Sequence, residues 1–470
     1  MESFYLKDLI QAINGKFIRG NLDLPVIGIS VDSRTIKKGE VYFAIQGNHY
    51  DGHDFIKESI AKGASAIVYS ESEVNSVKIL SNSFSVSMVK TDNTLIALGE
   101  LAKTYINRFK NIQTVGITGS NGKTTSKEIL VSIFSKKAKT LSNKNNFNNR
   151  IGLPLSVLNL TSNVKYAVFE MGTSLYGEIK ILSDIVKPNV GIITNIGLSH
   201  LKTFISPKGV FKEKKVLFGN VKEDGAIIVN NDDKFLKKIC KVKNSRKVIT
   251  FACDADADMC AKNIMLSFDK INFELFYNKK SVKIKMSMKG KFNVSNALAA
   301  AACAVSFGFS LDEIKYGIEN FKPPEMRMET IVTKKGVILV NDAYNANPSS
   351  MQETIQAVSR HYIDRKINLV LGDMLELGNK SIDYHFELGK FINTQKNIDS
   401  VYLIGEMSFY TKMALVNKNV FHTKETGIIL QKLNQILVDH TYVFLFKASR
   451  SMKLEEIYVK FHKVIKQRSI

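Results

Sequence analysis

The strongest constraint on the fold is a series of short, almost wholly apolar segments with helical segments between them. Strands of this kind are buried on both faces, which is typical of a largely parallel sheet covered by helices on both sides. The sequence therefore predicts an α/β protein. The predicted strands cover residues 115–117, 167–169, 190–193 and 226–229 and, in a second series, residues 337–340, 368–371, 401–404 and 442–446.

The chain of 470 residues is too long for one hydrophobic core, and we expect three domains. Residues 26–69 alternate apolar runs with polar turns around a helical stretch at 54–62, which indicates a small α/β module. A helical pattern at 94–109 follows this module. Pro323 and Pro324 follow an amphipathic helix at 311–321, and proline cannot continue a helix. The expected domains are 1–109, 110–321 and 322–470.

The composition is that of a globular protein with a diffuse positive charge. The formal net charge is +22, but lysines are scattered over every segment and arginine occurs only ten times. Nucleic-acid binding requires basic residues clustered on one face, so we expect no nucleic-acid partner and a surface that favours small anionic substrates. The four cysteines show no CxxC spacing and have no histidine nearby, which predicts neither a zinc site nor a disulfide framework.

The sequence predicts no membrane insertion. The first eight residues do not combine a basic region with an apolar stretch, and the most apolar run, 297–309, is too short to cross a bilayer. We therefore expect a cytoplasmic protein.

A glycine-containing loop stands directly after a predicted strand and directly before a predicted helix. In this setting glycines let backbone N–H groups approach phosphate oxygens, the helix N-terminus favours negative charge, and a lysine reaches the terminal phosphates. The strict P-loop spacing is not met, because Ile117 stands five residues before the second glycine. The position of the loop still predicts a nucleotide site. Its residues are Thr118, Gly119, Ser120, Asn121, Gly122, Lys123, Thr124 and Thr125.

Polar residues end the next two predicted strands. Glu170 follows the strand at 167–169, and the strand at 190–193 leads through Asn195 to His200. Either side chain alone could be an ordinary solvated residue. In an open parallel sheet, however, ligands bind beyond the carboxyl ends of the strands, where the phosphate loop also lies. A carboxylate and an imidazole at that edge are candidate ligands of a metal or its water shell.

Several segments resemble the Mur ligases. In the central domain they are the phosphate loop, residues 148–154 (Asn-Asn-Arg-Ile-Gly-Leu-Pro), Glu170-Met171-Gly172, residues 194–197 and His200-Leu201. The resemblance implies a P-loop-type, mostly parallel ATPase domain between a small N-terminal α/β domain and a Rossmann-like C-terminal domain. It also implies ATP and Mg²⁺ as cofactors. Lys202 stands where an acidic residue is frequent, and Ala448 stands where glycine is usual before Ser-Arg.

Further segments narrow the resemblance to the branch of the family that joins D-alanyl-D-alanine to UDP-N-acetylmuramoyl-tripeptide. They are residues 31–34, 47–55, 342–348, 371–378 with His385, and 447–452. The resemblance implies that Ser33, Arg34, Asp51, His53, Asn148 and Asn149 contact the nucleotide-linked precursor. It implies that Tyr344, Asn345 and Asn347 shape the dipeptide pocket, although Asn-Ala-Asn-Pro is also ordinary turn chemistry.

The same resemblance assigns catalytic roles. Lys123 is expected to contact the terminal phosphates, and Thr124 and Glu170 to bind Mg²⁺. His200 and a carbamylated lysine are expected to hold a second metal ion, with Lys214 as first choice and Lys212 or Lys215 as alternatives. Asn296 is expected to face the adenine, Arg327 the ATP phosphates and Asp342 the ribose. Asn296 could equally be the polar start of the apolar helix that follows it.

Two other functions remain open at this point. One is another Mur-type or folylpolyglutamate-type amide ligase, and the other is a non-catalytic nucleotide switch. A switch would need the phosphate loop but would have no use for Glu170, His200 and Lys214 together. We expect a monomer.

Overall fold

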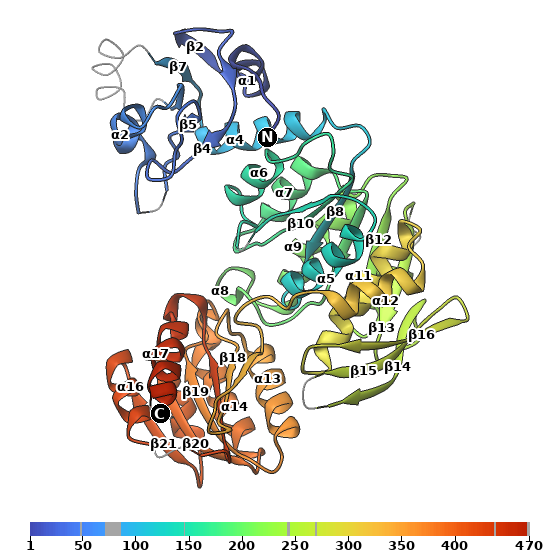
Figure 1. Cartoon of the computed structure of the whole chain (residues 1–470), viewed down its shortest axis with the longest axis vertical. Coiled ribbons are helices and arrows are strands. Elements are labelled where there is room, and N and C mark those ends of the chain that lie inside the picture. Colours follow the sequence, from blue (N-terminus) through green and yellow to red (C-terminus); the bar gives the residue numbers. More distant parts are fainter. Residues whose placement is uncertain are drawn as a thin grey trace.

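The computed structural model describes residues 1–47, 49–70, 86–144, 146–241, 245–267, 270–436 and 439–467. Figure 1 shows three α/β domains in a row, with the N-terminal and C-terminal domains at opposite ends of the central one. Asn48, in the predicted precursor-binding segment, lies outside the described residues. Within those residues, none of the helices has both the length and the apolar character needed to cross a membrane.

The N-terminal domain is built on a five-stranded sheet. Its order is β2 (Lys16–Arg19), β7 (Ser87–Lys90), β6 (Ala66–Tyr69), β5 (Val41–Phe43) and β4 (Ile29–Ser30). All neighbours are parallel except β2 and β7. Two short strands, β1 (Phe4–Tyr5) and β3 (Pro25–Val26), pair separately. The helical elements are α1 (Leu6–Ala12), η1 (Gly52–Phe55), α2 (Ile56–Ala61) and α4 (Thr94–Ile106).

Helix α4 attaches this domain to the central one. Asn93 caps its start, because the Asn93 side chain accepts a hydrogen bond from the backbone N–H of Ile96 at 3.0 Å. Its apolar face, which includes Leu98 and Leu101, is buried. Helix α4 packs against two helices of the central domain, α6 (Gly152–Val157) and α7 (Glu178–Val186).

The central sheet has nine strands in the order β16-β15-β14-β13-β12-β11-β8-β10-β9. All neighbouring strands are parallel except at one edge of the sheet. There β15 pairs antiparallel with β14, and β16 pairs antiparallel with β15. Their bounds are β8 (Gln113–Thr118), β9 (Thr140–Ser142), β10 (Tyr166–Glu170), β11 (Val190–Ile193), β12 (Ala226–Asn230), β13 (Lys247–Ala252), β14 (Met259–Leu266), β15 (Ile271–Tyr277) and β16 (Lys280–Met286).

Helices cover both faces of this sheet. Val168 of β10 packs into the core under α5 (Lys123–Ser135), α11 (Phe292–Ser306) and α12 (Leu311–Asn320), whereas Phe169 packs into the core under α6 and α7. Helix α11 is rich in buried alanine, and such small side chains let it lie close to α5. The remaining helices are α8 (Leu201–Phe204), α9 (Pro207–Lys214), α10 (Val216–Asn220) and η3 (Leu236–Lys241).

The C-terminal domain contains a six-stranded sheet in the order β17-β18-β22-β19-β20-β21, parallel except for β17. The strands are β17 (Glu329–Val332), β18 (Ile338–Asn341), β19 (Lys366–Gly372), β20 (Ile398–Ile404), β21 (Asn419–Thr423) and β22 (Tyr442–Lys447). The helices are α13 (Pro348–His361), η4 (Gly378–Lys380), α14 (Ser381–Asn393), α15 (Ser408–Ala414), α16 (Thr426–Asn434), η5 (Arg450–Met452) and α17 (Leu454–Gln467).

The domain boundaries predicted after residues 109 and 321 fall between the sheets. Helix α4 ends at Ile106 and β8 begins at Gln113, whereas α12 ends at Asn320 and β17 begins at Glu329. The division at these two residues stays a prediction.

Candidate functional site

The phosphate loop joins β8 to α5 and requires glycine at two positions. Gly119 and Gly122 have φ angles of +151° and +80°. A Cβ at Gly119 would lie 1.9 Å from Thr194 Oγ1, and one at Gly122 would lie 2.0 Å from Asn296 Oδ1. Asn195 holds the loop, because its side chain accepts a hydrogen bond from the backbone N–H of Asn121 at 2.9 Å. The loop therefore presents a fixed backbone at the start of α5.

Not every residue predicted for this loop faces a ligand. Thr118 is fully buried, and its hydroxyl donates to the Met171 carbonyl at 2.8 Å. Thr125 is also buried on α5. These two residues are part of the buried structure under the loop.

Lys123 is folded back over its own loop. Its Nζ donates to the carbonyl oxygens of Gly119 at 2.9 Å and Ser120 at 3.4 Å. Burial lowers the pKa of Lys123, while the nearby Glu170 opposes the shift. The ammonium has backbone carbonyls as hydrogen-bond partners here, and phosphate oxygens could replace them without breaking an ion pair.

Glu170 at the end of β10 is fixed by two side chains. It is 2% exposed, and its carboxylate accepts hydrogen bonds from Thr124 Oγ1 and Asn148 Nδ2, both at 2.8 Å. Thr124 belongs to α5, so the end of the strand and the start of the helix present a carboxylate and a hydroxyl together. These oxygen donors fit Mg²⁺, which is usually bound by one or two protein groups plus phosphates and water.

Lys214 ends α9, is 1% exposed and lines the same cavity as Lys123 and Glu170. Burial lowers its pKa well below the ordinary value, and the positive charge of Lys123 lowers it further. The two alternatives, Lys212 and Lys215, are both exposed. Among the three, Lys214 is the one that faces the cavity.

His200 connects the central and C-terminal domains. Its Nδ1 lies 2.6 Å from Glu376 Oε2, and the backbone N–H of Lys202 donates to the Glu376 carbonyl at 2.9 Å. The bond to His200 lowers the pKa of the Glu376 carboxyl. Both His200 and Glu376 have positive φ angles, 51° and 62°, a strained backbone conformation that is frequent at functional sites. Among the described residues, no three His, Cys, Asp or Glu side chains are grouped as a ready-made metal cluster.

The C-terminal domain supplies the opposite wall. The Arg327 guanidinium lies 4.1 Å from the centre of the Tyr344 ring, and its buried Nε has no hydrogen-bond partner among the described residues. Asn347 caps α13 and donates from Nδ2 to Asn121 Oδ1 of the phosphate loop at 2.7 Å. The two domains therefore meet directly at the phosphate loop.

Asp342 is held inside the C-terminal domain. Its Oδ2 accepts hydrogen bonds from Lys447 Nζ at 2.5 Å and Thr354 Oγ1 at 2.7 Å, and its Oδ1 accepts one from the Met328 backbone at 3.1 Å. A carboxylate has about four acceptor positions, so one remains after these three bonds.

A cavity of about 860 Å³ unites the central and C-terminal walls. The predicted residues that line it are Ser120, Asn121, Gly122, Lys123, Asn148, Asn149, Glu170, His200, Lys214, Arg327, Tyr344, Asn345 and Asn347. The sequence did not single out Glu178, Glu376 or Arg450, which also line it. Two of these three lie in segments that carried the family resemblance, 371–378 and 447–452, and that signal could have found them.

The residues predicted in the N-terminal domain do not line this cavity, as far as the described residues show. Ser33 donates to Glu58 at 2.9 Å, and Arg34 pairs with Asp32. His53 Nδ1 lies 2.5 Å from Asp51 Oδ1, while its Nε2 accepts from the Ser70 backbone at 3.0 Å. All four residues are hydrogen-bonded to groups of their own domain.

Asn296 lies beside the phosphate loop, but it does not begin a helix. Helix α11 begins at Phe292, so Asn296 is in its second turn, where it is buried and donates to Asn293 Oδ1 at 2.9 Å. The alternative reading of Asn296 as a helix start is therefore wrong. Asn293 lies in the first turn, and its Nδ2 donates to the Lys289 carbonyl at 2.7 Å, so this buried carboxamide is also hydrogen-bonded.

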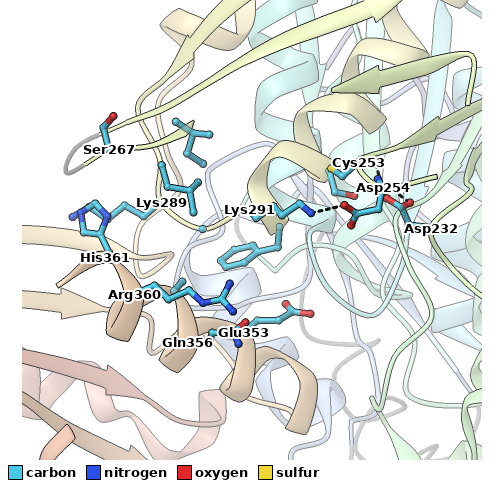
Figure 2. A pocket seen from close by; sticks show the side chains of 16 residues that line it. Asp232, Cys253, Asp254, Ser267, Lys289, Lys291, Glu353, Gln356, Arg360 and His361 are labelled. Atoms are coloured by element: carbon cyan, nitrogen blue, oxygen red, sulfur yellow. Dashed lines mark hydrogen bonds and ion pairs between the residues drawn. The ribbon is translucent and has the colours of Figure 1, made fainter. Parts of the chain in front are cut away.

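A second cavity, of about 380 Å³, lies where the start of α11 faces α13 (Figure 2). Phe292 and Lys291 come from the central domain, and Glu353 and Arg360 from the C-terminal domain. Lys291 is directed away from α13 and pairs with Asp254 at 2.5 Å. Because Phe292 lies one turn before Asn296, this cavity is close to the phosphate loop along α11.

Comparison with known proteins identifies the family. Residues 25–106 match the Mur ligase family catalytic domain, residues 117–304 the Mur ligase middle domain, and residues 326–461 the Mur ligase glutamate ligase domain. The UDP-N-acetylmuramoyl-tripeptide–D-alanyl-D-alanine ligase of Bacillus subtilis is 33% identical over 459 residues, which cover 96% of this chain and 97% of that protein. The chain belongs to the Mur ligase family.

Solved structures of Mur ligases have the same architecture. MurF from Acinetobacter baumannii superposes with a TM-score of 0.88 at 28% identity, covering 98% of this chain and 99% of that one. The MurF ligase from Thermotoga maritima, solved in complex with ADP, gives 0.82 at 28% identity, covering 94% and 98%. The predicted α/β class with three domains, and the resemblance to the Mur ligases, are confirmed.

Proposed function

We propose that this Mur ligase uses ATP and Mg²⁺ to join D-alanyl-D-alanine to UDP-N-acetylmuramoyl-tripeptide. The observation that carries the proposal is the near full-length similarity to ligases with that name, together with a cavity in which the phosphate loop faces Tyr344, Asn345 and Asn347. In the proposed reaction a carboxylate oxygen of the tripeptide attacks the γ-phosphorus and ADP leaves. The dipeptide amine then attacks the acyl phosphate, loses its proton and displaces phosphate.

The cavity supplies what phosphoryl transfer requires, which is positioning and positive charge. Lys123 would exchange its carbonyl partners for phosphate oxygens, and Arg327 would place its unpaired Nε–H toward the same group. Thr124 and Glu170 would hold Mg²⁺, which would neutralise phosphate charge when bound. Asn296 would face the adenine and Asp342 would accept a ribose hydroxyl at its remaining position.

Lys214 is proposed to act as a carbamate. A carbamate forms only from the neutral amine, and the burial that lowers the pKa of Lys214 favours that form. The modified side chain would be an anionic oxygen ligand in the same cavity as His200, suited to a second hard cation. An unmodified ammonium at this position would instead repel a cation.

The substrates are proposed to arrive from different domains. Ser33, Arg34, Asp51 and His53 would hold the nucleotide end of the precursor in the N-terminal domain, and Asn148 and Asn149 would contact it at the central cavity. Tyr344, Asn345 and Asn347 would receive the dipeptide. We propose a cytoplasmic monomer, in agreement with the nucleotide-linked and ATP substrates.

The test is release of phosphate from ATP by the purified protein. UDP-N-acetylmuramoyl-tripeptide, carrying lysine or diaminopimelate in parallel reactions, is supplied with D-alanyl-D-alanine, with glutamate, with diaminopimelate or with no acceptor. We expect sustained phosphate release and a pentapeptide product only in the reactions that contain D-alanyl-D-alanine as the acceptor. Sustained release with glutamate or diaminopimelate would replace the proposal by another amide ligase. Nucleotide binding without turnover under every condition would indicate a switch.

A further inference from the structure

The end of β10 is held on its outer side by a side chain instead of a strand. Strand β9 pairs with β10 at Thr140↔Tyr166, Leu141↔Ala167 and Ser142↔Val168 and ends there, two residues before Glu170. At Glu170, the Asn143 carboxamide replaces the missing backbone partner from β9. Its Oδ1 accepts from the Glu170 N–H and its Nδ2 donates to the Glu170 carbonyl, both at 2.9 Å. A carboxamide has the donor and acceptor of a peptide group, so Asn143 extends the ladder to Glu170.

Asn143 is itself anchored to the helix that carries the phosphate loop. It is 0% exposed, and its carbonyl accepts a hydrogen bond from Lys127 Nζ at 2.6 Å. Lys127 is 1% exposed and lies one turn after Lys123 on α5. Its charge is balanced by Glu128 at 2.9 Å. A buried ammonium loses its hydration, and the ion pair with Glu128 and the hydrogen bond to the Asn143 carbonyl compensate for that loss.

We propose that Asn143 is a positioning residue for Glu170, and that Lys127 holds Asn143 in register with the phosphate loop. Thr124 and Asn143 then hold Glu170 at two different places, Thr124 at the carboxylate and Asn143 at the backbone. Both contacts trace back to α5, which fixes the carboxylate relative to the hydroxyl. The inference rests on the proposed function, because it assigns to this geometry the binding of the cation that accompanies ATP.

The physical reason for such a device is the position of Glu170 at the rim of the cavity. Without Asn143, the N–H and carbonyl of Glu170 would lack their partner at the edge of the sheet, next to a water-accessible cavity. The end of β10 could then shift, and the carboxylate with it. Metal sites require their ligands to be held within about 0.5 Å, and changing a group that orients a ligand typically weakens metal binding by about 10–100-fold.

The experiment measures Mn²⁺ binding to the full-length protein with a non-hydrolysable ATP analogue, followed by electron paramagnetic resonance. We expect Asn143→Ala to raise the Mn²⁺ concentration for half-occupancy by about tenfold or more, while metal-free binding of the analogue changes less than about twofold. Lys127→Met should weaken Mn²⁺ binding less than Asn143→Ala does, and Lys127→Arg should restore part of the loss. If Asn143→Ala does not fold, the comparison of Lys127→Met with Lys127→Arg tests the same positioning role.

The matched control is Asn189→Ala. The Asn189 side chain also completes a strand, because its Oδ1 accepts from the Thr114 N–H at 2.9 Å, but it does so at the amino end of the sheet. Loss of this bond should lower the melting temperature without changing Mn²⁺ binding. Wild-type Mn²⁺ affinity in Asn143→Ala, or an equal loss in Asn189→Ala, overturns the inference and leaves the proposed function intact. A wild-type protein that binds no Mn²⁺ with nucleotide overturns both.

Discussion

Replacing Lys214 by alanine is the sharpest test of the proposed chemistry. The side chain is 1% exposed and lines the cavity, so its removal opens space beside the proposed cation site without altering the surface. Loss of one electrostatic element of this kind raises the barrier by about 3–4 kcal/mol, which is about a 10²–10³-fold fall in kcat. We therefore expect Lys214→Ala to retain less than about 1% of wild-type turnover.

Small carboxylates provide the assay that separates chemistry from packing. Formate or acetate can enter the space vacated in Lys214→Ala and supply an oxygen ligand, so turnover should partly return in a saturable way. Lys214→Met fills the same space and should not respond. Lys215→Ala, one residue further along and exposed, should behave as wild type.

Isotope labelling provides the second readout. Wild-type protein in ¹³C-labelled bicarbonate should show a carbamate resonance that Lys214→Ala lacks. Normal turnover in Lys214→Ala, or spectra that do not differ between the two proteins, would refute the reasoning and leave Lys214 as a buried lysine without a role at the metal.

Three further predictions follow from described contacts. Lys123→Ala should reduce ligation by about 10²–10³-fold with little change in melting temperature, because it removes the proposed phosphate contact and no core group. Activity assays and thermal unfolding check this. Burial lowers the pKa of His385, so the unfolded state binds more protons than the folded state below about pH 6.5, and the free energy of unfolding falls as the pH drops there. The melting temperature of His385→Gln should therefore fall less than that of the wild type between about pH 7.5 and 5.5. Equal falls in the two proteins would contradict this. Saturation with nucleotide and precursor should compact the three domains, and an unchanged small-angle scattering profile would count against closure.

The fully buried strands were predictable from the sequence, whereas the half-exposed ones were not. The predicted segments 190–193 and 442–446 lie within β11 and β22, because continuous apolar runs have few alternatives to a central strand. Strand β16 alternates lysines with buried Ile284 and Met286, so it is apolar on one face only. Its lysines interrupt the apolar run that would have predicted a strand. The antiparallel extension of the central sheet was missed for that reason.

The local structure of the candidate site was predictable where its residues are contiguous in the chain. The phosphate loop is one such segment, since the strand, the glycines and the helix are contiguous. The partner of His200 was not predictable, because Glu376 comes from another domain and its contact depends on how the two domains dock. The family resemblance ranked Lys214 ahead of Lys212 and Lys215, but the sequence did not show which of the three is buried. Only the packing of α9 determines which of them is buried.

The cavity shared by the central and C-terminal domains has a consequence for inhibitor discovery. One wall carries Lys123, and the other carries Arg327 and Asn347. A compound that fills the cavity therefore gains affinity from both domains only at the interdomain angle that brings the two walls together. Fragments screened against either domain alone would meet half of the surface and would rank poorly. Screens should therefore use the whole chain, and a rigid compound that spans both walls should hold the two domains at that angle.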